Sequence, residues 1–380
     1  MSSKKFYIIR LGCASLQADE IKIASCLQKN ALSLSSGIED ADIIIVLTCG
    51  FSYKPYNESI DKVKEINNNK KKSAKIWVGG CIPAINKNFT QELSFEIDLI
   101  FAPRNFEKVL NEYINKHPFL FQTSDTIAEY NQSEIYPIRI INGCTENCAY
   151  CVIKRAGGKA LSQPISKLEQ EIRNIGDRIK CISLVGEDIG AYGKDIDASL
   201  EELIKLIIQI HPEIKISFST IHPKYFVQDF EMYVRIFNTH KNLDLVLPVP
   251  IQSGSNMVLK LMKRDYNIDD VVNCFQIFTD KFPDVKISTD VMVGYPGETW
   301  DSFLLTKRMV EKLPLAALSC FKFDDMTKIG NTISEEEKIK RLKIISLAFF
   351  RNYCKKNNIQ DSNALKHYLD KDKILLNINF

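Results

Sequence analysis

Three cysteines in the middle of the chain follow the pattern C-x3-C-x2-C. The segment runs Asn142-Gly143-Cys144-Thr145-Glu146-Asn147-Cys148-Ala149-Tyr150-Cys151 and follows a predicted strand. Three thiolates on one short loop can hold three irons of a [4Fe-4S] cluster, whereas a self-contained structural cluster or zinc site takes four protein ligands. The pattern therefore predicts a cluster with one iron open to a ligand. The alternatives are a zinc site with a fourth ligand elsewhere, or three cysteines packed in a core.

An open iron is what radical S-adenosylmethionine chemistry requires. The iron can chelate the amino and carboxylate groups of the methionine moiety and pass an electron to the sulfonium. Cys144, Cys148 and Cys151 are accordingly the predicted catalytic cysteines and metal ligands. The adjacent Gly143 and the loop position after a strand favour a site over a packed core.

A second set of three cysteines lies in the first hundred residues. Cys13, Cys49 and Cys81 each follow a predicted strand and stand next to a glycine. The carboxyl ends of parallel strands share one edge of a sheet, so loops far apart in sequence can meet there. These thiolates predict a second cluster with an open iron. The alternative is coincidental burial of small apolar cysteines at strand ends.

The other cysteines of the chain stand inside predicted helices or strands without partner spacing. We expect them to be structural; they are Cys26, Cys181, Cys274, Cys320 and Cys354. Eleven cysteines in 380 residues are too few for a disulfide scaffold, which needs roughly 8–10% cysteine in a short secreted chain.

The elements that carry the second cysteine set alternate between strand and helix. Strand-like apolar runs lie at residues 6–12, 42–48, 75–79 and 98–101, and helical spacing occupies 17–29 and 58–67. This alternation predicts an α/β fold with a parallel N-terminal domain over residues 1–125. A polar stretch without clear period, residues 126–135, is a predicted linker.

The C-x3-C-x2-C loop belongs to a longer series of strands and helices. The predicted strands are residues 136–141, 180–185, 214–219, 244–250, 285–293 and 316–323. Right-handed crossovers would wrap this series into a partial or full (β/α) barrel over residues 136–330, with its ligand site at the C-terminal strand ends. An amphipathic helix is predicted within residues 331–360, and residues 361–380 form a short tail.

Composition excludes several classes of protein. The chain has 45% apolar and 26% charged residues, and 50 basic against 47 acidic residues leave a net charge of +3. No global basic field of the histone kind exists, so any nucleic-acid contact must be local. The apolar runs are strand-sized and no signal-peptide core follows Met1, which predicts a cytoplasmic protein without membrane association.

Four further segments give the sequence a family resemblance. They are Gly186-Glu187-Asp188-Ile189-Gly190-Ala191-Tyr192-Gly193-Lys194-Asp195, Pro250-Ile251-Gln252-Ser253-Gly254-Ser255, Met262-Lys263-Arg264-Asp265-Tyr266 and Thr289-Asp290-Val291-Met292-Val293-Gly294-Tyr295-Pro296-Gly297-Glu298-Thr299. With both cysteine sets, they make the chain similar to radical-SAM methylthiotransferases from about residue 5 to about residue 355. It most resembles the subgroup that converts N6-threonylcarbamoyladenosine beside the tRNA anticodon into its 2-methylthio derivative.

The resemblance implies a reaction and its cofactors. These are two [4Fe-4S] clusters and S-adenosylmethionine, and the (β/α) barrel would be a radical-SAM barrel. The Cys144/Cys148/Cys151 cluster would reduce S-adenosylmethionine to a 5′-deoxyadenosyl radical, which abstracts hydrogen from an unactivated carbon. Sulfur carried on the Cys13/Cys49/Cys81 cluster and methylated by a second S-adenosylmethionine would then be captured. An electron donor and a sulfur source are implied partners.

Several side chains after the barrel strands are predicted cofactor contacts. Glu187 and Asp188 would accept the S-adenosylmethionine ammonium group, with an exposed acidic turn as the alternative. Gln252 and Ser253 would bind ribose or adenine edges, with helix N-capping as the alternative for Ser253. Tyr150 would pack against the adenine.

The sequence also departs from the family pattern. Gly157-Gly158 stands where the family usually has Arg-Gly, and residues 323–330 lack the usual arginine. The small C-terminal barrel that grips tRNA in the family is expected to be missing, so tRNA binding should be weak. Two alternatives to a tRNA substrate follow: methylthiolation of a protein or peptide, and a non-catalytic iron-sulfur protein.

Overall fold

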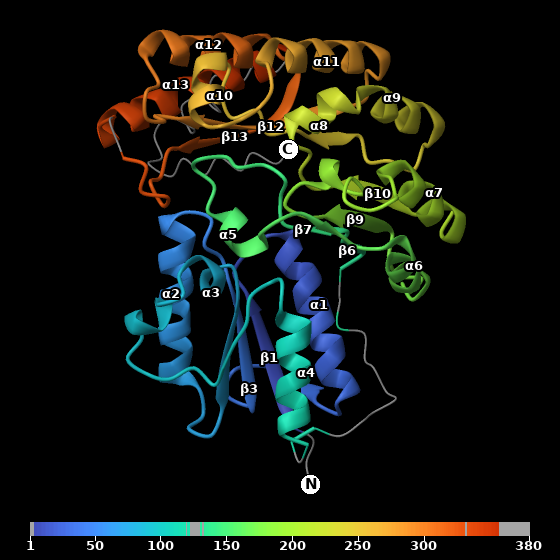
Figure 1. The fold of residues 1–380 in the computed structure, drawn as a ribbon, viewed down its shortest axis with the longest axis vertical. Helices are drawn as coiled ribbons and strands as arrows, with labels where there is room; N and C mark the ends of the chain where they lie inside the picture. The colour runs from blue at the N-terminus through green and yellow to red at the C-terminus, as the bar shows by residue number, and fades with distance from the viewer. Residues whose placement is uncertain (1–3, 119, 122–129, 131–132, 331–332, 357–380) are drawn as a thin grey trace. The chain divides into compact units, whose positions relative to one another are not determined.

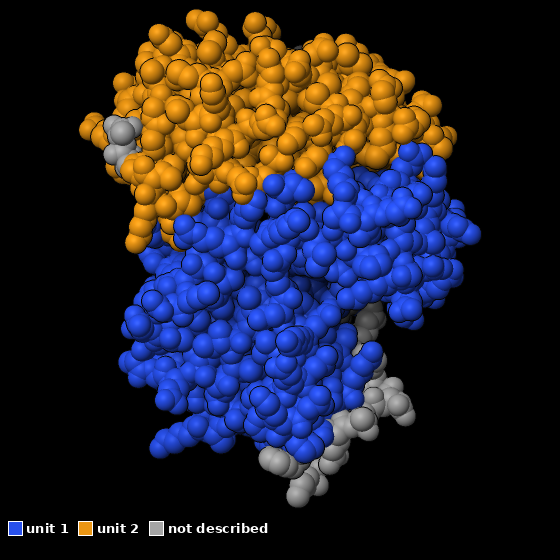
Figure 2. Space-filling view, in the orientation of Figure 1, with its two compact units in different colours: residues 1–145, 151–187, 192–214 blue, residues 146–150, 188–191, 215–380 orange. Residues whose placement is uncertain are grey.

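The computed structural model describes residues 4–118, 120–121, 130, 133–330 and 333–356. These residues form two compact units, coloured separately in Figure 2. The first unit comprises residues 1–145, 151–187 and 192–214, and the second comprises residues 146–150, 188–191 and 215–380.

The N-terminal part of the first unit is a parallel sheet in the order β2-β1-β3-β4-β5. Its strands are β1 (Lys5–Arg10), β2 (Ser33–Leu34), β3 (Ile43–Thr48), β4 (Lys75–Gly80) and β5 (Leu99–Ile100). The central strand β3 is buried at every position, because both faces of the sheet are covered by helices.

Helices cover the two faces of this sheet (Figure 1). They are α1 (Ala14–Lys29), α2 (Tyr53–Asn69), α3 (Ile82–Ile85) and α4 (Phe106–Lys116), with a 3-10 turn η1 at Phe89–Glu92. Apolar residues of α1 and α4 pack with Trp77 and the strands in one core cluster. Figure 1 shows α2 and α3 on the other side of the sheet.

The rest of the first unit begins with strand β6 (Ile135–Arg139), which pairs in parallel with β9 (Cys181–Val185). Between them the chain forms a short antiparallel pair, β7 (Ile141–Asn142) with β8 (Leu161–Ser162). The helices here are α5 (Ile153–Gly157), α6 (Ile165–Arg173) and α7 (Leu200–Ile210). Helix α1 packs against β6, so the N-terminal sheet and the β6–β9 pair share helix α1.

The second unit contains the parallel sheet β11-β12-β13. The strands of the second unit are β10 (Lys215–Phe218), β11 (Val246–Pro248), β12 (Lys286–Val293) and β13 (Leu315–Lys322). Strand β10 is not part of the β11-β12-β13 sheet. The helices of this unit are α8 (Pro223–Gln228), α9 (Phe230–Thr239), α10 (Asn256–Leu261), α11 (Ile268–Lys281), α12 (Trp300–Lys312) and α13 (Glu335–Lys356), and a 3-10 turn η2 spans Ile189–Ala191. Two helices follow each of β10 and β11, and one follows each of β12 and β13, so strands and helices alternate along the chain.

The structure confirms the predicted α/β class with a parallel N-terminal sheet. Every predicted strand has a counterpart, although β5 and β11 are shorter than the apolar runs that predicted them. The two-residue strands β2, β7 and β8 were not predicted, because so short a segment has no period. The predicted domain and linker boundaries stay predictions, since most of residues 126–135 and all of 361–380 lie outside the described residues. Among the described helices, none combines the length and the apolar run needed to span a bilayer.

Candidate active site

The three N-terminal cysteines lie at one edge of the parallel sheet. Cys13 is the N-cap of α1 after β1, Cys49 follows β3, and Cys81 follows β4 at the start of α3. Strands β1, β3 and β4 are neighbours in the sheet and run in the same direction. Their carboxyl ends therefore bring the three loops together, as the sequence predicts.

Close backbone approach supports this grouping. A Cβ atom on Gly12 would lie 3.4 Å from the Cβ of Cys49. Gly80 has a φ of +91°, and a Cβ there would lie 2.4 Å from the carbonyl oxygen of Thr48. Only glycine allows β3 and β4 to meet this way just before Cys81.

The electrostatics of these thiols fit a bound cationic group. Burial raises the pKa of Cys81, and the nearby Cys13, Cys49 and Glu187 raise it further. Burial and the charge of Cys13 likewise raise the pKa of Cys49. Thiols that disfavour one another's ionisation are stabilised as thiolates by iron, which supplies the missing positive charge. Within the described ranges, no group of three or more His, Cys, Asp or Glu stands at the spacing of a single metal ion.

The loop that carries the C-x3-C-x2-C cysteines is fixed at its first residue. Gly143 has a φ of +75°, and a Cβ there would lie 2.5 Å from the carbonyl oxygens of Gly158 and Lys159. The backbone N–H of Cys144 donates to the carbonyl of Gly158 at 3.2 Å. Cys144 and Cys151 belong to the first unit and Cys148 to the second.

Glu187 lies beside this loop in the first unit. Its Oε2 accepts from the backbone N–H of Gly143 at 2.7 Å, and its Oε1 accepts from Arg139 Nη1 at 3.2 Å. The side chain is only 12% exposed, so the alternative of an exposed acidic turn is wrong for Glu187. Both carboxylate oxygens already have partners, and the predicted contact with the S-adenosylmethionine ammonium group stays a prediction.

In the second unit, a buried arginine adjoins Cys148. Arg264 Nη1 donates to Tyr150 Oη at 2.7 Å and lies 3.8 Å from Cys148 Sγ. Its Nη2 and Nε donate to the Pro250 carbonyl at 2.8 Å and to Tyr266 Oη at 3.1 Å. Burial opposes the charge, but Tyr150, Tyr266 and Cys148 raise the pKa of Arg264 well above its usual value. A permanent positive charge therefore stands beside one predicted cluster ligand.

Asp188 is a buried carboxylate of the second unit, 1% exposed, so the exposed-turn alternative is wrong here too. Its Oδ1 accepts from the backbone N–H groups of Gly190 at 3.1 Å and His222 at 3.0 Å. Its Oδ2 is buried and has no hydrogen-bond partner among the described residues. Burial, partly offset by these backbone hydrogen bonds, raises the pKa of Asp188 to about 7. A buried acceptor without a donor is a fitting partner for a ligand's ammonium group.

Gln252 and Ser253 are both buried, but they differ in available polar atoms. Gln252 has a φ of +63°, and its Oε1 is buried without a partner in the described part of the chain. The Ser253 hydroxyl instead accepts from the backbone N–H of Ser255 at 3.2 Å and lies 3.3 Å from Thr306 Oγ1. Gln252 is thus the freer of the two predicted cofactor contacts, and Ser253 closes the turn before α10.

Tyr150 packs its ring against an apolar cluster of the second unit. The members of this cluster are Val258, Met262, Met292, Tyr295 and Phe323. The ring meets Tyr295 edge to face at a centroid distance of 6.4 Å. Its predicted contact with adenine is not tested by these neighbours.

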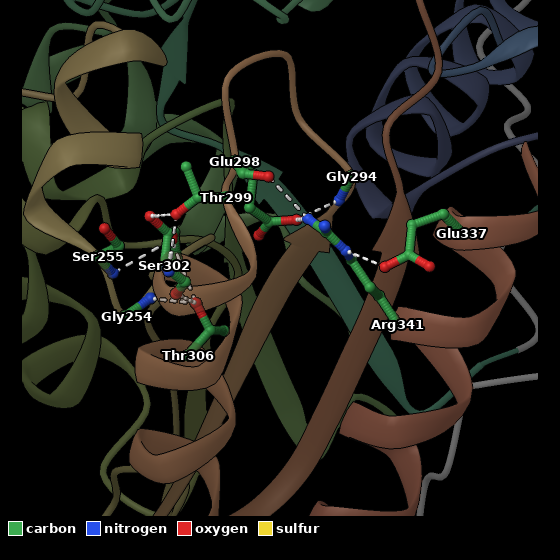
Figure 3. Close-up of polar contacts among 10 residues, drawn as sticks. Gly254, Ser255, Gly294, Glu298, Thr299, Ser302, Thr306, Glu337 and Arg341 are labelled. Carbon is green, nitrogen blue, oxygen red and sulfur yellow. Dashed lines mark hydrogen bonds and ion pairs between the residues drawn. The ribbon is translucent and has the colours of Figure 1, made fainter. Parts of the chain in front are cut away.

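The last family segment ends in a turn held by a buried ion pair (Figure 3). Glu298 Oε2 accepts from the Gly294 backbone N–H and from Arg341 Nη1, both at 2.7 Å. Arg341 reaches this turn from α13 and also donates through Nε to Glu337 at 3.0 Å. Helix α13 therefore fixes the loop after strand β12.

Comparison with known proteins identifies both parts of the chain. Residues 138–310 match the Radical SAM superfamily, and residues 5–102 match the Uncharacterized protein family UPF0004. The tRNA-2-methylthio-N(6)-dimethylallyladenosine synthase of Sulfurovum sp. (strain NBC37-1) is 30% identical over 84% of this chain and 77% of its own length. The chain therefore belongs to the radical-SAM methylthiotransferase family.

Two other proteins show how far the similarity extends. The probable threonylcarbamoyladenosine tRNA methylthiotransferase of Methanocaldococcus jannaschii is 28% identical over 81% of this chain and 73% of its own length. The cobalamin-dependent S-adenosylmethionine radical enzyme OxsB with aqua-cobalamin bound has a TM-score of 0.56 at 13% identity. That match covers 91% of this chain and 56% of OxsB, and it shows a shared fold alone.

Membership makes this methylthiotransferase an enzyme whose family uses S-adenosylmethionine and [4Fe-4S] clusters. The structure fits such groups through the grouped thiols of the N-terminal sheet edge and the fixed loop at Cys144.

The methylthiotransferase also contains arginines that sequence reasoning missed. Arg104 lies against Gly158, one of the departures from the family pattern, and donates to the Lys159 carbonyl. Arg139 and Arg264 are buried beside predicted cluster ligands. The segment Met262 to Tyr266 was a usable signal for Arg264, whereas Arg139 had none.

Proposed function

We propose that this protein transfers a methylthio group to a modified adenosine in tRNA. The observation that carries the proposal is the similarity to relatives named for this reaction across 73–82% of their length. Both three-cysteine sets are present, one at the sheet edge of the first unit and one in the loop after β7. Neither a peptide substrate nor a non-catalytic role has comparable support.

Each cysteine set has its own role in this proposal. Cys144, Cys148 and Cys151 would hold the cluster that binds S-adenosylmethionine, and Cys13, Cys49 and Cys81 the auxiliary cluster. When bound, these groups supply a 5′-deoxyadenosyl radical and the sulfur that is transferred. Asp188 and Gln252 offer buried acceptor atoms without partners among the described residues, so they are the favoured contacts for the ammonium group and the nucleoside of S-adenosylmethionine.

Two tRNA nucleosides are candidates for the substrate. N6-threonylcarbamoyladenosine is the prediction from the sequence motifs, and one reported relative carries that name. N6-dimethylallyladenosine is the second candidate, because the relatives from Sulfurovum and Sulfurihydrogenibium are named for it. An electron donor, a sulfur source and a cytoplasmic site of reaction complete the proposal.

Mass spectrometry of nucleosides from total tRNA, with and without the gene, tests the substrate. We expect one 2-methylthio nucleoside to disappear without the gene and to return with the wild-type chain. Its mass identifies which of the two adenosines is modified. Unchanged 2-methylthio nucleosides in both strains would overturn the proposal.

A matched pair of variants tests the assignment of the cysteines. Replacing Cys13, Cys49 and Cys81 by alanine should abolish methylthio product while S-adenosylmethionine cleavage to 5′-deoxyadenosine persists. Replacing Cys144, Cys148 and Cys151 should abolish both. Persistent cleavage in the second variant would exclude these residues as ligands of the S-adenosylmethionine cluster.

A further inference from the structure

Arg139 ends strand β6 and is 5% exposed. Its Nη2 donates to the Ser15 carbonyl at 2.7 Å and to Asp19 Oδ2 at 2.9 Å. Its Nη1 donates to Glu187 Oε1 at 3.2 Å and to Asn142 Oδ1 at 3.3 Å. One guanidinium thus connects three segments that are far apart in sequence.

The segments joined by Arg139 lead to one cysteine of each set, Cys13 and Cys144. Ser15 and Asp19 lie on α1, whose N-cap is Cys13. Glu187 follows β9 and also accepts from the backbone N–H of Gly143, the residue before Cys144. A continuous, largely buried chain of hydrogen bonds therefore runs from the first turn of α1 after Cys13 through Arg139 and Glu187 to Gly143, next to Cys144.

The charge of Arg139 also acts on the auxiliary thiols. Burial opposes its ionisation, but Asp19, Glu187, Cys13 and Cys81 raise the pKa of Arg139 above its usual value. Two of its partners, Ser15 and Asp19, lie on α1 within two turns of Cys13. Arg139 Nε is buried and has no hydrogen-bond partner among the described residues, so one N–H donor is left over in this network.

We propose that Arg139 is a positioning residue that holds the two cysteine loops of the first unit together and sets the reduction potential of the auxiliary cluster. The inference rests on the proposed function in one respect: it needs a cluster on Cys13, Cys49 and Cys81. Reduction adds negative charge to a cluster, and a buried cation nearby stabilises the reduced form. Glu187 acts in the opposite direction, because its negative charge disfavours the reduced form.

The test measures potentials in the full chain with Cys144, Cys148 and Cys151 replaced by alanine, so that only the auxiliary cluster remains. After anaerobic reconstitution, iron is counted per chain and the midpoint potential is followed by electron paramagnetic resonance during reductive titration. Arg139→Met should shift the equilibrium at least tenfold toward the oxidised cluster, which is about 59 mV for one electron. Arg139→Lys keeps the charge and should recover most of the shift.

Glu187→Gln provides a variant with the opposite expected sign, since removing its charge should favour the reduced cluster. Arg341→Met is the matched control, because Arg341 also lies between two carboxylates, but its ion-pair partners among the described residues are Glu298 and Glu337 of the second unit. Its loss should leave the potential unchanged. Loosening of the fold alone would not move Arg139→Met and Glu187→Gln in opposite directions.

The outcomes separate this inference from the proposed function. Failure of the parent protein to bind iron would remove the auxiliary cluster, and would overturn both. Normal iron content with an unchanged potential in Arg139→Met would overturn only the role of Arg139. An equal shift in Arg341→Met would also overturn it, because the effect would then be general.

Discussion

Arg139 of the first unit and Arg341 of the second are both nearly buried, and each lies between two carboxylates. Arg139 pairs with Asp19 and Glu187, and its side chain is 6% exposed. Arg341 pairs with Glu298 and Glu337, and its side chain is 7% exposed. Both sites consist of one arginine and two carboxylates, so any difference in function must come from the residues around them.

Those neighbours differ in kind. The partners of Arg139 lie on segments that lead directly to Cys13 and Cys144. Arg341 instead closes the turn after β12, and its aromatic neighbours are Trp300 and Phe303 of α12. A buried ion pair can therefore position cysteine-bearing segments in the first unit and hold a turn against a helix in the second. Matched substitutions of the two arginines and of their partners test this difference.

The largest expected effect is a loss of stability, of similar size in Arg139→Met and in Arg341→Met. Arg139→Met removes the ion-pair partner of Asp19 and Glu187, and Arg341→Met removes that of the buried Glu298. Each change should lower the free energy of unfolding by about 3–5 kcal/mol. Urea denaturation under anaerobic conditions measures both. A loss in only one variant would show that the two arginines are not energetically equivalent.

The next effect is a pH dependence at Asp19, where burial, opposed by Arg139, raises the pKa to about 6 from 3.8. Between these values the folded chain holds a proton that the unfolded chain has lost. The stabilising contribution of proton binding is thus full below pH 3.8 and is lost as pH rises through 6. The change is on the order of 3 kcal/mol, since each pKa unit is worth about 1.4 kcal/mol.

Asp19→Asn should remove this dependence, so that unfolding free energies measured between pH 4 and pH 7 fall less steeply than in the wild type. Glu187 and Lys22 also face Asp19, and the charge of Lys22 lowers the pKa of Asp19. Lys22→Met is therefore the control, because it keeps the Asp19 carboxyl and should keep the pH dependence. Parallel curves for Asp19→Asn and wild type would contradict the assignment.

A smaller loss of stability is expected when Glu187 or Glu298 loses its charge; each of these carboxylates accepts a backbone N–H group. Glu187→Gln and Glu298→Gln keep the side-chain shape but lose the charge. Each should lose about 1.5–3 kcal/mol, the range for hydrogen bonds to charged groups. Glu298 is 0% exposed and Glu187 is 12% exposed, so Glu298→Gln should lie at the upper end. Thermal melts of both variants give the order, and a reversed order would mean that exposure does not decide it.

The smallest effect belongs to Glu337, which is 29% exposed and stands four residues before Arg341 on α13. Pairs of this kind contribute about 0.3–0.5 kcal/mol in helices, so Glu337→Gln should barely change the unfolding free energy. The same measurement on Asp19→Asn at pH 8 should give a clearly larger change. An equally small change in Asp19→Asn would indicate that burial of the carboxylate does not decide the size of these effects.

Much of the fold was predictable because its strands are long and periodic. The run of apolar residues that forms β3 leaves little choice but a buried strand, and the parallel order then brings Cys13, Cys49 and Cys81 to one edge. The roles of the cysteines in binding clusters stay a proposal. The same reasoning found no sign of the pair formed by β7 and β8, which have two residues each.

The arginines beside the cysteines show where sequence reasoning ended. In the sequence, Arg139 cannot be told from a surface arginine, because its burial depends on α1 packing against β6. Glu187 was predicted as an S-adenosylmethionine contact, and its observed partners Arg139 and Gly143 could not be foreseen. The distant partner of a single polar side chain is decided by how helices and strands pack, and the sequence around that side chain carries no sign of it.

Gly143 has a genetic consequence. Any side chain there would run into backbone carbonyl oxygens at 2.5 Å, and these cannot swing aside as the end of a side chain can. A single-base change that replaces this glycine would therefore displace Cys144 although every cysteine is still encoded. Screens for strains that lack 2-methylthio nucleosides should recover substitutions of Gly143 beside those of the cysteines. Mutations that abolish the reaction should therefore also occur outside the codons of the cysteines.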